Sequence, residues 1–156
     1  MREMIRRTSI AVFMLLLLVA ARADAQNIVR GCFDASLDDG SLAGTTFTVI
    51  FSYDADEVSD TGDSYVSLSS FDFTLLGVPF TRDDIFQGGQ AIFHDAVLDN
   101  VTASFQVRLP PNSPVNNITF GFGSSRGIAY IDLDNQFGSG SFVFSTCQPA
   151  EAAAAS

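Results

Sequence analysis

The feature that most constrains this chain is the alternation of apolar and polar residues over short segments. Successive side chains of a β-strand point to opposite faces, so this alternation predicts strands that bury one face. Phe occurs 15 times and Trp is absent, so phenylalanine supplies much of the buried face. The strongest predicted strands are 46–53, 70–75, 101–109, 118–122, 128–133 and 142–146, with weaker candidates at 28–33 and 90–94.

Short strands at regular spacing predict an all-β protein. We expect an antiparallel β-sandwich of about eight strands, with a closed β-barrel as the alternative. One set of apolar positions should form the core between the sheets. Its expected members are Phe47, Phe51, Phe71, Phe73, Phe105, Phe120 and Phe144.

Turn residues separate the predicted strands. Gly88-Gly89 should precede a strand, 110–114 (PPNSP) should interrupt the chain, and 123–127 (GSSRG) should link two strands. Helix signals are sparse. The segment 81–84 (TRDD) has capping-box character, so we expect one short helical turn there.

Residues 1–25 are typical of a secretory signal peptide. An apolar stretch, 10–21, precedes the small-x-small sequence Ala23-Asp24-Ala25, and the basic residues before it are Arg2, Arg6 and Arg7. The alternative is a membrane anchor, but a membrane span needs about 20 apolar residues. We therefore expect a secreted or periplasmic protein that has no membrane span after cleavage.

The remaining chain is the length of one ordinary domain. We expect a single β-sandwich domain over 26–148 and a disordered, Ala-rich tail over 149–156. The two cysteines, Cys32 and Cys147, lie near the two ends of that domain. In an oxidising compartment they predict one intramolecular disulfide, with two free thiols or an intermolecular bridge as alternatives.

The charge balance limits the partners. Asp and Glu number 18 against 8 Lys and Arg, which gives a formal net charge of −10. Phosphate backbones and anionic membranes would repel such a chain, so nucleic-acid binding is excluded. The expected partner is a protein or a glycan that the sequence does not identify.

One loop, 54–63 (DADEVSDTGD), is dense in carboxylates. Calcium takes six to eight oxygen ligands, and alternate acids on a loop can supply them. The candidate ligands are Asp54, Asp56, Asp60 and Asp63, although Val58 and Ser59 break the EF-hand pattern. The alternative is a solvated acidic loop that binds no metal, and no other cofactor is expected.

Three motifs resemble catalytic sites, and each lacks a required part. The segment 123–127 matches G-x-S-x-G by letters, but a strand follows it where a nucleophile elbow needs a helix. His94 and Asp95 should point to opposite faces at a strand end. Asp132 and Asp134 should lie on one face of a strand, about 6.5–7 Å apart, a spacing that glycoside hydrolysis allows, but aromatic platforms for a sugar are scarce. We therefore assign no catalytic residue.

A longer stretch resembles a pattern in exported bacterial proteins of the PEP-CTERM-associated type. The matching segments are 44–47 (GTTF), 51–54 (FSYD), 65–71 (YVSLSSF) and 77–81 (GVPFT). The C-terminal sorting signal of those proteins is not found after Cys147. The resemblance implies an exported β-sandwich and supplies no catalytic site.

Together these observations predict a secreted, non-enzymatic surface, matrix or interaction module. The alternative is a calcium-assisted module that binds carbohydrate or protein, and a hydrolase is a distant third possibility.

Overall fold

The computed structural model describes residues 26–108, 117–132 and 136–147. The expected signal peptide, the 110–114 interruption and the Ala-rich tail lie outside these residues. Three short 3-10 turns connect some of the strands: η1 (Ala55–Glu57), η2 (Arg82–Asp84) and η3 (Ser124–Arg126). The strands are β1 (Ile28–Leu37), β2 (Thr46–Asp54), β3 (Asp63–Leu75), β4 (Val78–Phe80), β5 (Ile85–His94), β6 (Val97–Arg108), β7 (Asn117–Phe122), β8 (Gly127–Asp132) and β9 (Phe137–Ser145).

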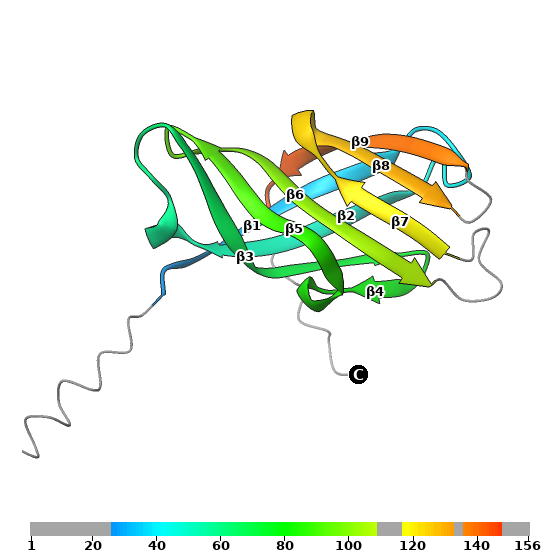
Figure 1. Ribbon diagram of the computed structural model, residues 1–156, viewed down its shortest axis with the longest axis horizontal. Helices are drawn as coiled ribbons and strands as arrows, with labels where there is room; N and C mark the ends of the chain where they lie inside the picture. Colours follow the sequence, from blue (N-terminus) through cyan, green and yellow to red (C-terminus); the bar gives the residue numbers. More distant parts are fainter. Residues whose placement is uncertain (1–25, 109–116, 133–135, 148–156) are drawn as a thin grey trace, which may run out of the picture.

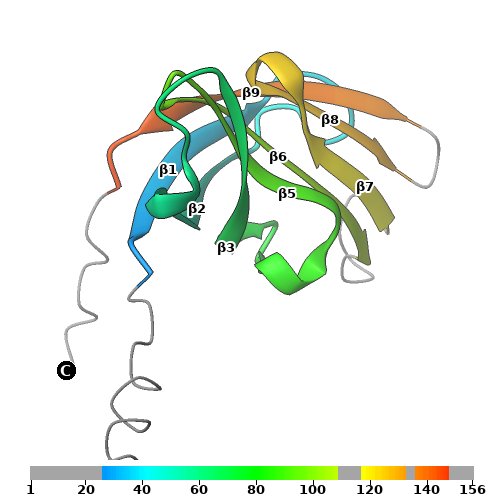
Figure 2. The ribbon, with the colours of Figure 1, turned by 60° about the vertical axis from the view of Figure 1, so that its left-hand side comes forward.

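The strands form one antiparallel sheet that closes on itself. Each strand of the ring pairs with the next, from β1 through β2, β3, β5, β6, β7, β8 and β9, and β9 returns to β1. Short β4 is an addition that pairs with the end of β3. The all-β prediction is confirmed, and the sheet takes the closed barrel form given as the alternative to the sandwich. Figures 1 and 2 show the wall curving from β9 and β8 through β7 and β6 to β5.

Two joints of this ring differ in how far they are paired. The β1–β9 joint runs from Cys32–Ser145 to Leu37–Gly140 without interruption. The β2–β3 joint runs only from Ile50–Asp72 to Tyr53–Leu68, and Ser69 is skipped in its register. Beyond the Ile50–Asp72 pair, β2 and β3 diverge toward the right of Figure 1.

Phenylalanine rings fill the barrel interior. Five of the seven predicted core phenylalanines are buried, whereas Phe47 and Phe144 are only partly buried and pack against the others. Phe33, Phe122 and Phe142 are also buried. Ring centroids are separated by 4.4 Å for Phe33–Phe142 and 4.7 Å for Phe73–Phe80, within the range of favourable aromatic contacts.

The skipped Ser69 explains an irregularity in the apolar pattern of β3. Val66 and Leu68 are buried, and so are Phe71 and Phe73, although 68 and 71 differ in parity. A β-bulge inserts one extra residue into a strand and so shifts its alternation by one. The bulge therefore lets both halves of this long strand face the interior.

Two turns test the predictions for the middle of the chain. The helical turn is confirmed as η2, where the Asp84 Oδ2 accepts the Thr81 N–H at 2.8 Å. The Gly88-Gly89 prediction is wrong, because both glycines lie inside β5. Both have a φ of 82°, and the β5–β6 register shifts between Gly88 and Gln90, so they form a bulge within the strand.

In the ranges that the structure describes, no helix has the length and apolar character needed to cross a membrane.

Candidate functional site

The disulfide prediction is confirmed. Cys32 on β1 and Cys147, two residues after β9, are joined, with their Cα atoms 5.2 Å apart. The bond lies beside the Cys32–Ser145 pair, at one end of the β1–β9 joint. It therefore ties the first strand of the barrel to the last at the point where the ring closes.

The acidic loop connects β2 to β3 and includes η1. The Oδ1 of Asp54 accepts the N–H of Asp56 at 3.1 Å, and Asp56 in turn accepts a bond from the Asn27 side chain at 3.4 Å. Asp60 is exposed in the loop, and Asp63 begins β3 and contacts His94. The four predicted calcium ligands therefore do not share a common partner: Asp54, Asp56 and Asp63 each contact a different group. Within the described part of the chain, no three His, Cys, Asp or Glu residues are grouped so that they could hold a metal ion.

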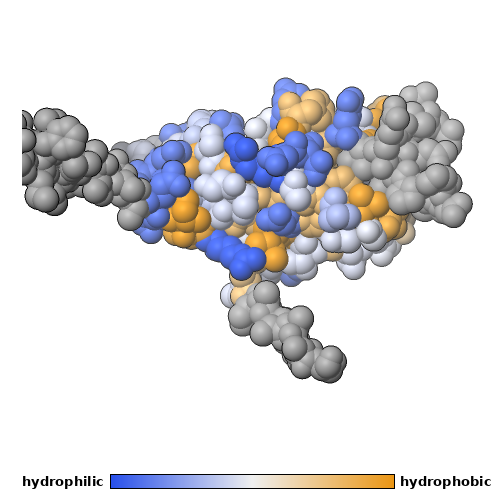
Figure 3. Space-filling model, turned by 90° about the horizontal axis from the view of Figure 1, so that it is seen from below, coloured by the Kyte–Doolittle hydropathy of each residue, from blue (hydrophilic) through white to orange (hydrophobic). Residues whose placement is uncertain are grey.

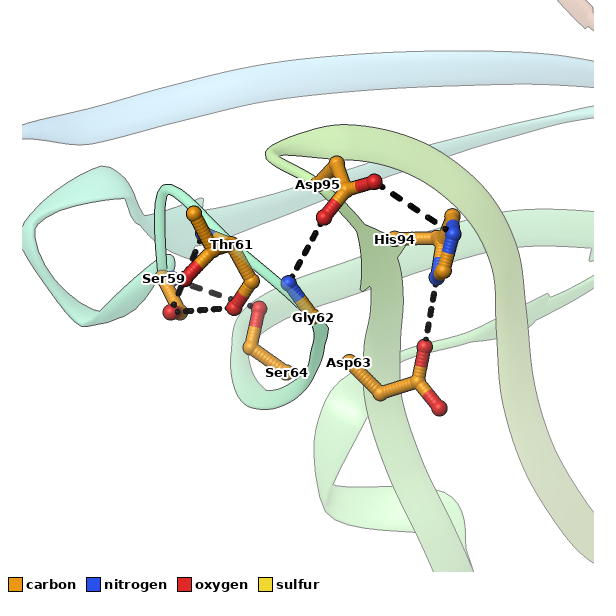
Figure 4. A network of polar contacts seen from close by, with 7 residues as sticks. All are labelled: Ser59, Thr61, Gly62, Asp63, Ser64, His94 and Asp95. Carbon is orange, nitrogen blue, oxygen red and sulfur yellow. Dashed lines mark hydrogen bonds and ion pairs between the residues drawn. The ribbon is translucent and has the colours of Figure 1, made fainter.

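Two aspartates lie within contact distance of His94, beside the acidic loop (Figure 4). His94 ends β5, and its Nδ1 is 2.7 Å from the Oδ1 of Asp63 on β3. Its Nε2 is 3.5 Å from the Oδ2 of Asp95. The other oxygen of Asp95 accepts the N–H of Gly62 at 2.7 Å. These contacts link the acidic loop to the β5–β6 turn.

The contact between His94 and Asp95 corrects the expectation that they point to opposite faces. That expectation assumes extended backbone at both residues. Asp95 has a φ of 48° and Ala96 a φ of 61°, so they form a two-residue hairpin turn of the type that needs positive φ at both positions. The turn brings the Asp95 carboxylate back toward the imidazole.

The two carboxylates raise the pKa of His94 above the 6.5 of an unperturbed histidine. The hydrogen bond that the Asp63 carboxylate accepts from the imidazole is the largest cause, and the charge of Asp95 adds to it. Protonated His94 is therefore favoured between the two acids. A raised pKa makes the neutral imidazole a stronger base. Both of its ring nitrogens face carboxylates, however, Nδ1 toward Asp63 and Nε2 toward Asp95.

The segment 123–127 is a hairpin turn, as predicted from its flanking strands. It joins β7 to β8 through η3, and the N–H of Gly123 donates to the carbonyl of Gly127 at 2.9 Å. Ser125 has a φ of 61° and is exposed. A strand follows the turn, so Ser125 lacks the helix that orients the serine of a nucleophile elbow.

The contacts of Asp132 hold two loops together, and Asp134 lies outside the described residues. Asp132 is 6% exposed at the end of β8. Its Oδ2 accepts the hydroxyl of Ser41 at 3.0 Å, and its Oδ1 accepts the N–H of Gln136 at 2.8 Å. The carboxylate thus joins the β1–β2 loop to the β8–β9 connection.

Tyr130 is a structural residue that the sequence reasoning missed. Its hydroxyl donates to the carbonyl of Asp39 at 2.8 Å and accepts the N–H of Leu42 at 2.7 Å. A Cβ on Gly138 would lie 2.0 Å from the Tyr130 ring, so glycine is required there. The signal available in the sequence is a tyrosine at an inward strand position, because a buried tyrosine hydroxyl needs a partner.

A shallow hollow of about 440 Å³ lies on the wall at β1 and β2. Its lining consists of Asp34, Ala35, Ser36, Thr46, Phe47 and Thr48. Ala35 and Phe47 face the core, so the outward side chains around the hollow are a carboxylate and three hydroxyls. The Oδ1 of Asp34 accepts the hydroxyl of Thr48 at 2.7 Å.

The outer surface is mixed in character. On the face seen in Figure 3, apolar and hydrophilic residues are interspersed. The most exposed large apolar side chains, Phe137, Val97, Val143 and Tyr65, come from β9, β6 and β3. Single exposed apolar residues are ordinary on protein surfaces and do not by themselves mark a binding site.

Comparison of this chain with protein-family models, with curated proteins and with solved structures finds no match.

Proposed function

We propose that this protein is an extracytoplasmic, non-enzymatic interaction module that binds its partners on its outer surface. The observation that carries the proposal is the packed interior. Phe33, Phe51, Phe71, Phe105 and Phe120 are at most 1% exposed inside the ring. A small barrel either fills its interior with side chains or holds one small ligand there. The packed rings indicate an interior filled by side chains. We therefore expect partners to bind at the outer wall and the loops.

The disulfide supports a location outside the cytoplasm. Disulfides persist in oxidising compartments and are rare in the cytosol. The bond between Cys32 and Cys147 encloses nearly all of the described chain. The basic and apolar pattern of residues 1–25 supports export independently.

The contacts of the chemically active residues support a non-enzymatic role. His94 contacts Asp63 and Asp95, and in the described ranges no Ser, Thr or Tyr hydroxyl is bonded to its ring. Nucleophilic catalysis needs a nucleophile within hydrogen-bond reach of its base. Ser125 and Asp132 lie in a hairpin turn and in a loop-anchoring network, respectively.

The test combines export, binding and turnover. The full chain is produced in an exporting bacterium, and mass spectrometry of the extracytoplasmic fraction should find a chain that begins at Gln26 with Cys32 and Cys147 joined. That material should bind members of a panel of immobilised glycans and exported proteins, and should not hydrolyse chromogenic esters or glycosides. Free thiols in a cytoplasmic chain would contradict the proposed location.

Turnover would contradict the non-enzymatic role. Hydrolysis that disappears in Asp132→Asn and persists in Asp99→Asn would assign it to the buried acid, since Asp99 is an exposed aspartate on β6.

A further inference from the structure

The diverging half of β2 has a strand neighbour on one side only. Residues Thr46 to Val49 pair with β1, from Ser36–Thr46 to Phe33–Val49. On the other side, pairing with β3 begins at Ile50. Among the strands that the structure describes, none pairs with Thr46–Val49 on that side. This segment is therefore an edge within an otherwise closed wall.

The direction of the backbone groups follows from the ladder. In an antiparallel pair, residues alternate between exchanging hydrogen bonds with the partner and pointing away from it. At one end of the β1–β2 ladder the Leu37 N–H donates to the Thr45 carbonyl, and at the other end the Ala55 N–H donates to Asn27. Odd-numbered residues of β2 thus bond to β1, and Thr46 and Thr48 direct their N–H and C=O groups to the unpaired side.

The β3 side of the divergence presents a similar edge. Thr74 pairs with Pro79 of β4, and proline has no N–H to donate. The Thr74–Pro79 pair is therefore a non-bonded position of that ladder, and the backbone groups of Thr74 point away from β4, toward β2. The ring of Phe47 stacks on that of Phe73, with centroids 5.3 Å apart, and bridges the two strands from the interior side.

The outward side chains beside this edge are hydroxyls and carboxylates. Thr46, Thr48 and Thr74 are exposed. Asp34 lies opposite Thr48 on β1, and Asp72 lies opposite Ile50 on β3. The nearest outward cation on these strands, Arg30, lies opposite Ser52, further along the ladder.

We propose that the Thr46–Val49 edge of β2 binds an extended cationic peptide segment of another protein, which adds as a strand to the barrel wall. The inference rests on the proposed function and names the partner class of that outer-surface site. Backbone groups of Thr46 and Thr48 supply the pairing, as in other complexes formed by strand addition. Apolar side chains of the peptide face Phe47 and Phe73, and basic side chains face outward to Asp34 and Asp72.

The hollow beside the edge has room for such a basic side chain. It extends over Asp34, Ser36 and Thr46 on the outer wall. Neighbouring strands are about 4.8 Å apart, so an arginine on an added strand reaches across β2 to the Asp34 carboxylate. A planar guanidinium pairs well with a carboxylate that already accepts one hydroxyl bond.

Charge favours a foreign partner over a second copy of the chain. The formal net charge is −10, so two copies of the chain repel each other, most strongly at low ionic strength. A cationic peptide is attracted by the same field, which raises its association rate and selects against acidic peptides.

The test uses the folded full chain and synthetic nonapeptides of alternating Val and Arg. Fluorescence polarisation should detect binding, and amide NMR shifts should concentrate at Thr46 and Thr48. A Val/Glu peptide should bind more weakly by about tenfold or more. The Val/Arg peptide N-methylated on its pairing edge should also bind more weakly, because it keeps its charge and loses its donors.

Two variants at one position separate backbone pairing from side-chain contact. Thr48→Pro removes the outward N–H and should abolish binding, whereas Thr48→Val keeps the backbone and should bind as the unaltered chain does. Equal binding of the methylated and unmodified peptides would overturn the proposal, and so would NMR shifts located away from β2. Both of these tests use the unaltered chain, so they remain valid even if Thr48→Pro fails to fold. Dimerisation through Thr48 without peptide binding would overturn it as well. Continued binding of a glycan or protein partner in either case would leave the proposed function standing.

Discussion

The β1–β9 and β2–β3 joints hold the barrel together in different ways. The β1–β9 joint brings together strands from opposite ends of the described chain, and it has continuous pairing and a disulfide. The β2–β3 joint connects strands separated by one loop, yet its pairing stops at Ile50–Asp72. A contact between distant segments costs more chain entropy than a local one. The distant joint has a covalent bond, whereas the local joint is only partly paired. The available edge therefore lies at the joint whose two strands are also connected by the short acidic loop.

Removing the Cys32–Cys147 disulfide should have the largest effect on stability. Replacing both Cys32 and Cys147 by Ser should lower the free energy of unfolding by about 4–5 kcal/mol, because the bond closes a loop with a sequence separation of 115. Urea unfolding measures the change, and reduction of the unaltered chain should reproduce it. Equal stability of the reduced and oxidised chains would show that the β1–β9 joint does not depend on its disulfide.

The two joints should also differ in how much a phenylalanine beneath each one contributes. Phe33→Ala, beneath the β1–β9 joint, should cost about 3–5 kcal/mol, because Phe33 is fully buried and contacts Phe142 and Phe122. Phe47→Ala, beneath the β2–β3 joint, should cost about 1–2 kcal/mol, because its ring is only partly buried. The same unfolding measurement compares them. An equal cost would mean that the β2–β3 joint is packed as tightly as its counterpart.

Much of the fold can be predicted from the alternation, but the ring closure cannot. Period-two patterning is the same for a sandwich and a barrel, and which strands pair is decided by distant contacts such as Cys32–Ser145. Phe33 lies in a weakly alternating segment and is missing from the predicted core, although it is fully buried. Phe142 is also missing, although it shares a strand and a face with Phe144, which the prediction includes. The Gly88-Gly89 pair predicts a turn, but glycines with positive φ occur in β-bulges as well as in turns, so the sequence does not distinguish the two.

The candidate sites were less predictable, for a local reason. The His94 cluster depends on Asp95 and Ala96, which have positive φ without being glycine. Such residues are uncommon, so the sequence predicts extended backbone at these positions and separates His94 from Asp95. The cysteine pair was predictable because export leaves few alternatives for two cysteines. The acidic loop was identifiable by composition, but the contacts of its individual acids were not.

Calcium binding at the acidic loop stays a prediction, and it concerns the paired end of the β2–β3 joint. If Asp54, Asp56, Asp60 and Asp63 rearrange around the ion, calcium at a hundredfold excess over its dissociation constant should add about 2.7 kcal/mol to stability. Thermal melts in chelator, calcium and magnesium at matched ionic strength test this, and Asp56→Asn should abolish the gain. Equal melting under the three conditions would make the loop a solvated acidic segment.

The smallest expected effect is the pH dependence of His94, at the same end. The hydrogen bond to Asp63 and the charge of Asp95 raise its pKa in the folded chain above 6.5. The charged histidine thus stabilises the fold fully below pH 6.5, and this contribution is lost as the pH rises through the raised pKa. An NMR titration of the imidazole should give a value above 6.5 that falls in Asp63→Asn. The same pKa in both proteins would exclude Asp63 as the cause.

Native-state hydrogen exchange at β2 tests the difference between the joints most directly. The amides of Phe47 and Val49 donate toward β1, whereas those of Thr46 and Thr48 face the unpaired side, so fast and slow exchange should alternate along this half of the strand. From Ile50 to Ser52, where β2 has neighbours on both sides, successive amides should all exchange slowly. Slow exchange at Thr46 and Thr48 as well would show that the wall is closed there, and would contradict both the open joint and the peptide-binding edge.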